Sequence, residues 1–79
     1  MEKERILAEV QDIFRDVLDN DDLEINFNTV ADDVDEWDSL SHIQLVVGIE
    51  KHFGLHFTSQ QITKWKDVGA MCDDIATSI

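Results

Sequence analysis

Between about Lys3 and Leu18, apolar side chains recur at every third or fourth position of the chain. Charged and polar residues separate most of them, and the apolar set is Ile6, Leu7, Val10, Ile13, Phe14, Val17 and Leu18. Side chains three and four positions apart lie on one face of an α-helix, so this spacing is typical of an amphipathic helix. The pattern predicts a first helix over about 3–18.

The helical period stops in the segment 19–38. Apolar residues are instead scattered through polar sequence, at Leu23, Ile25, Phe27, Val30, Val34 and Trp37. Residues 24–27 alternate like a short strand, but no other segment offers a partner strand, so we interpret them as loop. A connection of this length is long for a compact domain and is typical of functional loops. We expect it to lie across the helices with its apolar side chains inserted into the core.

Three more helical segments follow the loop. One covers 39–53 and stops at Gly54, because glycine readily takes the left-handed conformation that ends helices. A single turn is predicted over 59–63, and Asp67 is a good N-cap for a last helix over 68–78. These segments predict an all-α fold, a small four-helix bundle of three main helices and a short third helix, with a long loop between the first two.

The helix over 39–53 carries more apolar surface than one core requires. At about 100° per residue, its apolar positions form two stripes. The inner stripe is Leu45, Val46, Ile49 and Phe53, and the outer stripe is Leu40, Ile43 and Val47. A helix in a bundle buries one such stripe. The outer stripe is therefore either covered by a neighbouring helix or the loop, or left open for a partner protein.

Charge narrows the choice of partners. The chain has 79 residues, 18 acids, 6 bases and a net charge of -12. Its length predicts one domain, 1–79, and half of its acids fall in the loop, at Asp19, Asp21, Asp22, Glu24, Asp32, Asp33, Asp35, Glu36 and Asp38. Negative charge argues against nucleic acid and favours basic protein surfaces. No apolar run approaches the roughly 20 residues of a membrane span, so direct membrane insertion is not expected.

Cysteine and histidine give no sign of a metal site. Cys72 is the only cysteine, and it lies at helical spacing from other apolar residues, as a small core residue does. An isolated cysteine and a charged N-terminal segment favour the cytoplasm. His52 and His56 stand on either side of Gly54 and do not share a helical face, and the acidic loop lacks the glycine of a calcium loop.

Ser39 begins the 39–53 helix, directly after Asp38. The first N–H groups of a helix lack intrahelical partners and carry the positive end of the helix dipole, so a phosphate esterified to Ser39 would be stabilised there. The simpler interpretation is that Ser39 or Asp38 is only an N-cap, since both residue types favour that position. His42 lies one turn further on, but without an oxyanion-hole motif or a third residue we interpret it as partly buried rather than catalytic.

One stretch resembles the acyl carrier protein family, and with the acidic loop and the glycine stop the resemblance covers nearly the whole chain. It is Asp38-Ser39-Leu40-Ser41-His42-Ile43-Gln44-Leu45-Val46, continued by 49–54. The resemblance implies that Ser39 carries 4'-phosphopantetheine, transferred from coenzyme A by a phosphopantetheinyl transferase that also contacts Asp38. It also implies that the chain is not an enzyme. The chain would be a single carrier domain that presents thioester-bound acyl groups to acyl-loading and acyl-processing enzymes. Asp38 would then be the cap, because an esterified Ser39 is a poorer acceptor.

The resemblance also suggests a docking surface for basic patches of these enzymes. It comprises the outer stripe with Glu50, Asp35 and Glu36. Members that serve primary fatty-acid synthesis typically have acids along this helix, whereas here Ser41, Gln44 and Lys51 occupy three such positions. We therefore favour a monomeric carrier for a specialised acyl pathway, in fatty-acid, polyketide or lipid-type biosynthesis. The alternatives are an aminoacyl or peptidyl carrier, and an acidic interaction module without a covalent arm.

Overall fold

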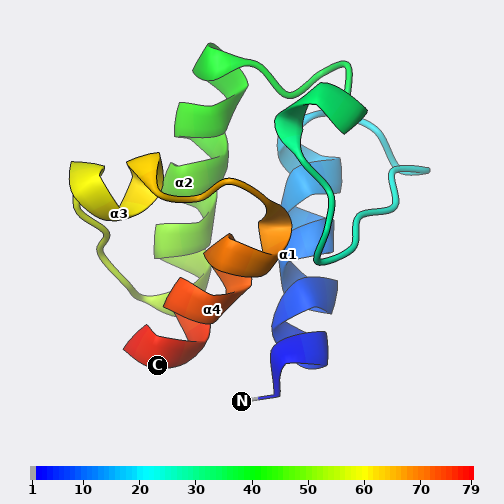
Figure 1. The fold of residues 1–79 in the computed structure, drawn as a ribbon. Helices are drawn as coiled ribbons and strands as arrows, with labels where there is room; N and C mark the ends of the chain where they lie inside the picture. Colours follow the sequence, from blue (N-terminus) through cyan, green and yellow to red (C-terminus); the bar gives the residue numbers. More distant parts are fainter. Residues whose placement is uncertain (1) are drawn as a thin grey trace.

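The computed structural model describes residues 2–79, and this part of the chain is all-α (Figure 1). Its elements are α1 (Lys3–Val17), the 3-10 turn η1 (Ala31–Asp33), α2 (Ser39–Phe53), α3 (Ser59–Thr63) and α4 (Val68–Ser78). The predicted four-helix bundle is confirmed. The differences are small: α1 ends one residue before Leu18, which caps it, and the long loop contains η1. None of the described helices combines the length and the apolar character needed to cross a bilayer.

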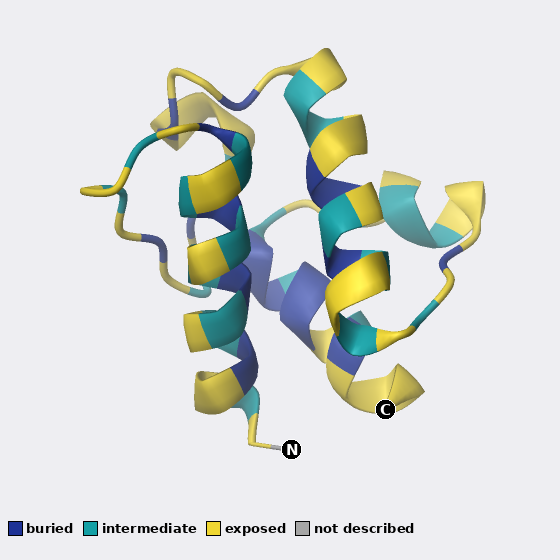
Figure 2. Ribbon diagram, turned by 180° about the vertical axis from the view of Figure 1, so that it is seen from behind, coloured by how far each residue is buried: buried dark blue, intermediate teal, exposed yellow. Residues whose placement is uncertain are grey.

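Helix α1 is the central support of the bundle and packs against both α2 and α4 (Figure 1). Its Ile6, Val10 and Phe14 are fully buried, and their spacing of four places them on one face. Figure 2 shows this division along α1, with buried positions on one side and exposed positions on the other. The same core cluster contains Leu45 and Ile49 of α2 and Val68, Met71, Cys72 and Ile75 of α4.

The loop between α1 and α2 is fastened to α1 by side-chain hydrogen bonds. Arg15 Nε donates to the carbonyl of Leu23 at 2.7 Å, and the N–H of Ile25 donates to Gln11 Oε1 at 2.9 Å. The buried apolar side chains of the loop are Ile25, Val34 and Trp37, and Thr29 is buried as well. Leu23 and Phe27 pack at the edge of the core. The loop therefore lies across the helices, as its scattered apolar residues predict, except that Val30 is only half-buried and lies outside the core cluster.

The start of α4 is tied to the same loop. Asp67 caps the helix, as predicted, by accepting a hydrogen bond from the N–H of Ala70 at 2.8 Å. The N–H of Gly69 donates to the carbonyl of Phe27 at 2.7 Å. A Cβ at position 69 would lie 2.7 Å from that carbonyl oxygen, so only glycine allows the loop to approach α4 this closely.

Helix α2 ends where the sequence predicts. Gly54 has φ 68°, a left-handed conformation, and the N–H of Leu55 donates back to the carbonyl of Glu50 at 2.9 Å. The chain then turns into α3, which is capped by reciprocal hydrogen bonds between Thr58 and Gln61. Of the four α-helices in residues 2–79, α3 alone has no buried residue, so it is the helix that contributes least to the core.

Candidate functional site

The first turn of α2 is organised by Asp38, not by Ser39. Asp38 is the N-cap, and its Oδ1 accepts a hydrogen bond from the N–H of Ser41 at 2.9 Å. This N–H, and next the Ser41 hydroxyl, hold the pKa of the Asp38 carboxyl below its ordinary value, because hydrogen bonds to a carboxylate favour its charged form. The predicted capping role of Asp38 is confirmed.

Two neighbouring serines have different surroundings here. The Ser41 hydroxyl accepts a hydrogen bond from the N–H of Asp38 at 2.8 Å and donates to the carbonyl of Glu36 at 2.9 Å. It completes a capping box that sequence reasoning did not foresee. Ser39 is exposed and takes no part in this network. The structure therefore leaves Ser39, rather than Ser41, available for modification.

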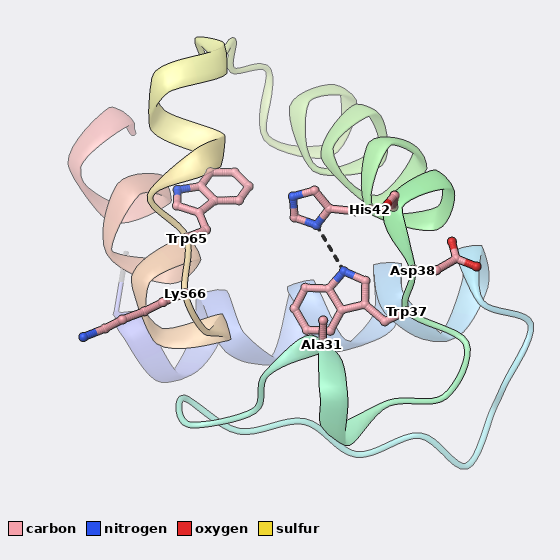
Figure 3. Close-up of a pocket in the computed structure, with 7 residues that line it drawn as sticks. Ala31, Trp37, Asp38, His42, Trp65 and Lys66 are labelled. Carbon is pink, nitrogen blue, oxygen red and sulfur yellow. Dashed lines mark hydrogen bonds between the residues drawn. The ribbon is translucent and has the colours of Figure 1, made fainter.

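A pocket of about 400 Å³ opens beside Ser39 (Figure 3). Three parts of the chain meet there: η1 with the end of the long loop, the first turn of α2, and the connection between α3 and α4. The lining residues are Ala31, Trp37, Asp38, Ser39, His42, Trp65 and Lys66. In Figure 3 the rings of Trp37, His42 and Trp65 point toward one another, whereas the side chains of Asp38 and Lys66 extend away. The interior is aromatic and suits an apolar group.

Trp37 joins this pocket to the core. Its ring packs edge-on against Phe14 of α1, with centroids 5.0 Å apart, and stacks on His42, with centroids 5.9 Å apart. The interpretation of Trp37 as an anchor for the loop is confirmed, since the residue is buried in the core cluster. It is also one wall of the pocket.

Trp65 forms the opposite wall, and sequence reasoning assigned it no role. Its Nε1 donates a hydrogen bond to Asp74 of α4, and its ring packs edge-on against Phe57 with centroids 5.0 Å apart. These contacts hold the indole against α4 and against the segment that precedes α3. The only signal in the sequence is an aromatic residue in a short polar connection, and that does not reveal what it faces.

His42 is half-buried, as predicted, and it faces the pocket. Its Nδ1 accepts a hydrogen bond from Trp37 Nε1 at 3.1 Å. Burial lowers the pKa of His42 below its ordinary value of 6.5, because desolvation disfavours the charged ring. The imidazole is therefore neutral at neutral pH.

The outer stripe of α2 is open to solvent. Leu40 is 69% exposed, Ile43 62% and Val47 43%. Neither the loop nor another helix covers these side chains, so the alternative in which they belong to the core is excluded. An apolar stripe of this kind, beside a charged loop, has the character of a protein-docking surface.

Glu50 differs from the other residues predicted to dock partners. Its carboxylate accepts a hydrogen bond from the N–H of Phe57 at 2.8 Å and lies 3.4 Å from His56 Nδ1, and only 20% of the side chain is exposed. It stabilises the turn after α2 instead of facing outward. Asp35 and Glu36, in contrast, are exposed beside the start of α2.

The remaining candidate groups lie apart from the pocket. Cys72 is buried in the core, as predicted, and burial raises the pKa of its thiol to about 11. His52 contacts Glu9 at 3.0 Å, away from the His56 contact with Glu50. Within residues 2–79 no three potential metal ligands gather at one place.

Comparison with known proteins gives one consistent result. Residues 8–75 match the family described as "Phosphopantetheine attachment site". The chain is 28% identical to an acyl carrier protein of Coprothermobacter proteolyticus, over 100% of this chain and 96% of the relative. It is also similar to the solution NMR structure of a holo acyl carrier protein from Geobacter metallireducens, with a TM-score of 0.87 and 37% identity, over 92% of this chain and 84% of that one. The span matched by the family contains Ser39, α2 and every residue of the pocket.

Proposed function

Because the chain belongs to the acyl carrier protein family, whose prosthetic group is 4'-phosphopantetheine, we propose that Ser39 is the residue that bears this group. The family consists of carriers, not catalysts, so the chain is a substrate of other enzymes. One observation supports Ser39 above all: it is exposed at the start of α2, outside the capping network, and beside an aromatic pocket.

The surroundings of Ser39 fit a phosphodiester. The start of α2 presents N–H groups that lack intrahelical acceptors, together with the positive end of the helix dipole. Asp38 occupies the cap through Ser41, so esterification of Ser39 removes no hydrogen bond that the helix start needs. The same cap holds α2 in place whether or not the group is attached.

The pocket beside Ser39 suits the cargo. When bound, the prosthetic group supplies a thiol that holds an acyl group as a thioester. Trp37 and Trp65 offer apolar walls to that group, and their contacts with Phe14 and Phe57 keep these walls in place.

Partner enzymes would dock on the outer stripe. Leu40, Ile43 and Val47 offer exposed apolar contact next to Ser39, and Asp35 and Glu36 add negative charge at the same end of α2. The family implies a phosphopantetheinyl transferase and acyl-processing enzymes as partners. The acidic loop would attract basic patches on these enzymes and so raise the rate of association. Glu50 is left out of this surface, because its carboxylate is held by Phe57.

The pathway served is a specialised one, in fatty-acid, polyketide or lipid-type biosynthesis. Along α2 the chain carries Ser41, Gln44 and Lys51 where acids are common, and Ser41 is committed to the capping box. Its acids are concentrated in the loop before α2 instead. This distribution favours partners whose basic patches extend from α2 over the loop. We place this carrier in the cytoplasm as a monomer, in keeping with its high negative charge and lone, buried Cys72.

Intact-mass measurement tests the attachment site. The chain is incubated with coenzyme A and a promiscuous phosphopantetheinyl transferase, and one phosphopantetheine is expected per molecule. Ser39→Ala should abolish the addition. Ser59→Ala is a matched control, because Ser59 is also exposed at the first position of a helix, directly after its N-cap Thr58. No addition to the folded wild type, or full addition to Ser39→Ala, would contradict the proposal.

A further inference from the structure

His42 uses one ring nitrogen within the protein and turns the other toward the pocket. Nδ1 accepts the hydrogen bond from Trp37 Nε1. Figure 3 shows the second nitrogen, Nε2, on the opposite edge of the ring, on the side of Trp65. The rings of His42 and Trp65 are nearly perpendicular, at 77°, with centroids 6.3 Å apart. Nε2 therefore lies at the pocket, between two aromatic walls.

The contact with Trp37 decides where the imidazole proton is. An indole Nε1 only donates, so Nδ1 of His42 has to be the bare, accepting nitrogen. A neutral imidazole carries one proton, which then lies on Nε2. Burial lowers the pKa of His42 and keeps the ring neutral, and Trp37 is itself held against Phe14. The protein thus presents a fixed N–H donor to the pocket.

This donor needs an acceptor from outside the chain. In the described part of the chain, the one hydrogen bond recorded for the His42 side chain is that with Trp37. The carboxylate among the pocket residues belongs to Asp38, which is engaged by Ser41 and extends away from the ring (Figure 3). An N–H in a partly dry aromatic pocket gains most from a carbonyl oxygen that enters with a ligand, since otherwise it depends on water.

We propose that His42 positions the group attached to Ser39 by donating a hydrogen bond from Nε2–H to one of its carbonyl oxygens. That oxygen belongs to an amide of the phosphopantetheine arm or to the acyl cargo. The proposal rests on the proposed function, because a carbonyl reaches the pocket only if Ser39 carries the arm. Trp37 and Trp65 contact the apolar part of the same group, so the pocket selects for an oxygen at one place along it.

NMR of the chain labelled with 15N in its histidine rings tests the proposal directly. Three forms are compared: unmodified, carrying phosphopantetheine, and carrying an acyl-phosphopantetheine. We expect the Nε2–H tautomer in all three. In a form that fills the pocket, the Nε2 proton should shift downfield and exchange with water up to about tenfold more slowly.

Each outcome of this comparison has a separate meaning. A change already present with phosphopantetheine alone assigns the acceptor to the arm, and a change that needs the acyl group assigns it to the cargo. If the mass shows loading and the Nε2 signal stays as in the unmodified chain, the proposal is overturned and the carrier function stands. If no loading occurs, both are overturned.

Two substitutions separate a hydrogen bond from a packing effect. His42→Gln places an amide N–H near the position of Nε2, whereas His42→Asn imitates only the Nδ1 side of the ring. The rise in melting temperature on loading is measured within each variant, so that differences between the unloaded variants cancel. We expect His42→Gln to keep most of the wild-type rise and His42→Asn to lose it. Equal rises in the two variants would contradict a donor role for Nε2.

Discussion

Helices α1 and α2 have the same length, 15 residues each, but they use their apolar residues differently. In α1 the large apolar side chains are buried or packed at the edge of the core. In α2 one stripe is buried and another is exposed, and three of the four exposed large apolar residues in 2–79 lie on it: Leu40, Ile43 and Val47. Helix α1 therefore serves the core alone. Helix α2 serves the core and also exposes the stripe on which we propose that partners dock, with Ser39 at its start.

The largest expected effect is a difference in the free energy of unfolding between substitutions on the two sides of α2. Leu45 is fully buried and Leu40 is mostly exposed, so the same substitution tests both sides. Leu45→Ala should lower the free energy of unfolding by about 2–5 kcal/mol, because it removes buried methyl groups and leaves a cavity. Leu40→Ala should change it by less than about 0.5 kcal/mol. Urea unfolding measures both, and equal losses would mean that the outer stripe belongs to the core.

The next effect concerns docking. Val47→Asp should raise the KM of a phosphopantetheinyl transferase for the chain about tenfold, because it places a charge in an apolar contact surface. Gln44→Asp is the control, since it adds the same charge at an exposed position of α2 outside the outer stripe. Both variants should keep the wild-type circular dichroism. An unfolded Val47→Asp, or an equal effect of the control, would refute the division of α2 into two sides.

A smaller effect is expected from salt. Negative charge at Asp35 and Glu36, next to the exposed stripe, should accelerate encounters with basic enzymes. Raising the ionic strength from about 0.05 M to 0.5 M should therefore lower the association rate several-fold, while the outer-stripe contact is much less affected. Stopped-flow measurement of transferase binding gives this rate. An association rate that is independent of salt would contradict steering by the loop.

The smallest effect is a pH dependence of stability on the pocket side of α2. Burial lowers the pKa of His42 in the folded chain below its ordinary value of 6.5, so the unfolded chain binds this proton first as the pH falls. The contribution of His42 to stability is therefore intact above pH 6.5 and is lost as the pH falls through that value toward the folded pKa. Thermal unfolding of wild type and His42→Gln should diverge in this range. Parallel profiles would contradict the effect.

The helices could be predicted from the sequence. Their boundaries follow from local signals, namely the spacing of apolar residues in α1, Asp38 before α2, Gly54 after it, and Asp67 before α4. The exposed stripe was also foreseeable, because α2 has more apolar surface than one core can take. Whether that stripe was covered depended on the path of the loop, and spacing along one helix does not contain that information.

The pocket beside Ser39 could not be predicted from such local signals. It is formed by Trp37, His42 and Trp65, which come from three segments. They meet only because Trp37 packs against Phe14 of α1 and Trp65 is held by Phe57 and by Asp74 of α4. The resemblance places Glu50 on the docking surface, and the sequence gives no sign of a partner for it within the chain. Its actual partner, the N–H of Phe57, lies seven residues further on, in a turn whose geometry no local pattern specifies.

Peptide mapping of the transferase-treated wild type tests the central claim most directly. Ser39 and Ser41 are two residues apart, and only Ser39 lies outside the capping network of α2. Fragmentation of the peptide that contains both serines should place the whole phosphopantetheine mass on Ser39. Modification of Ser41, or of any residue other than Ser39, would contradict the account.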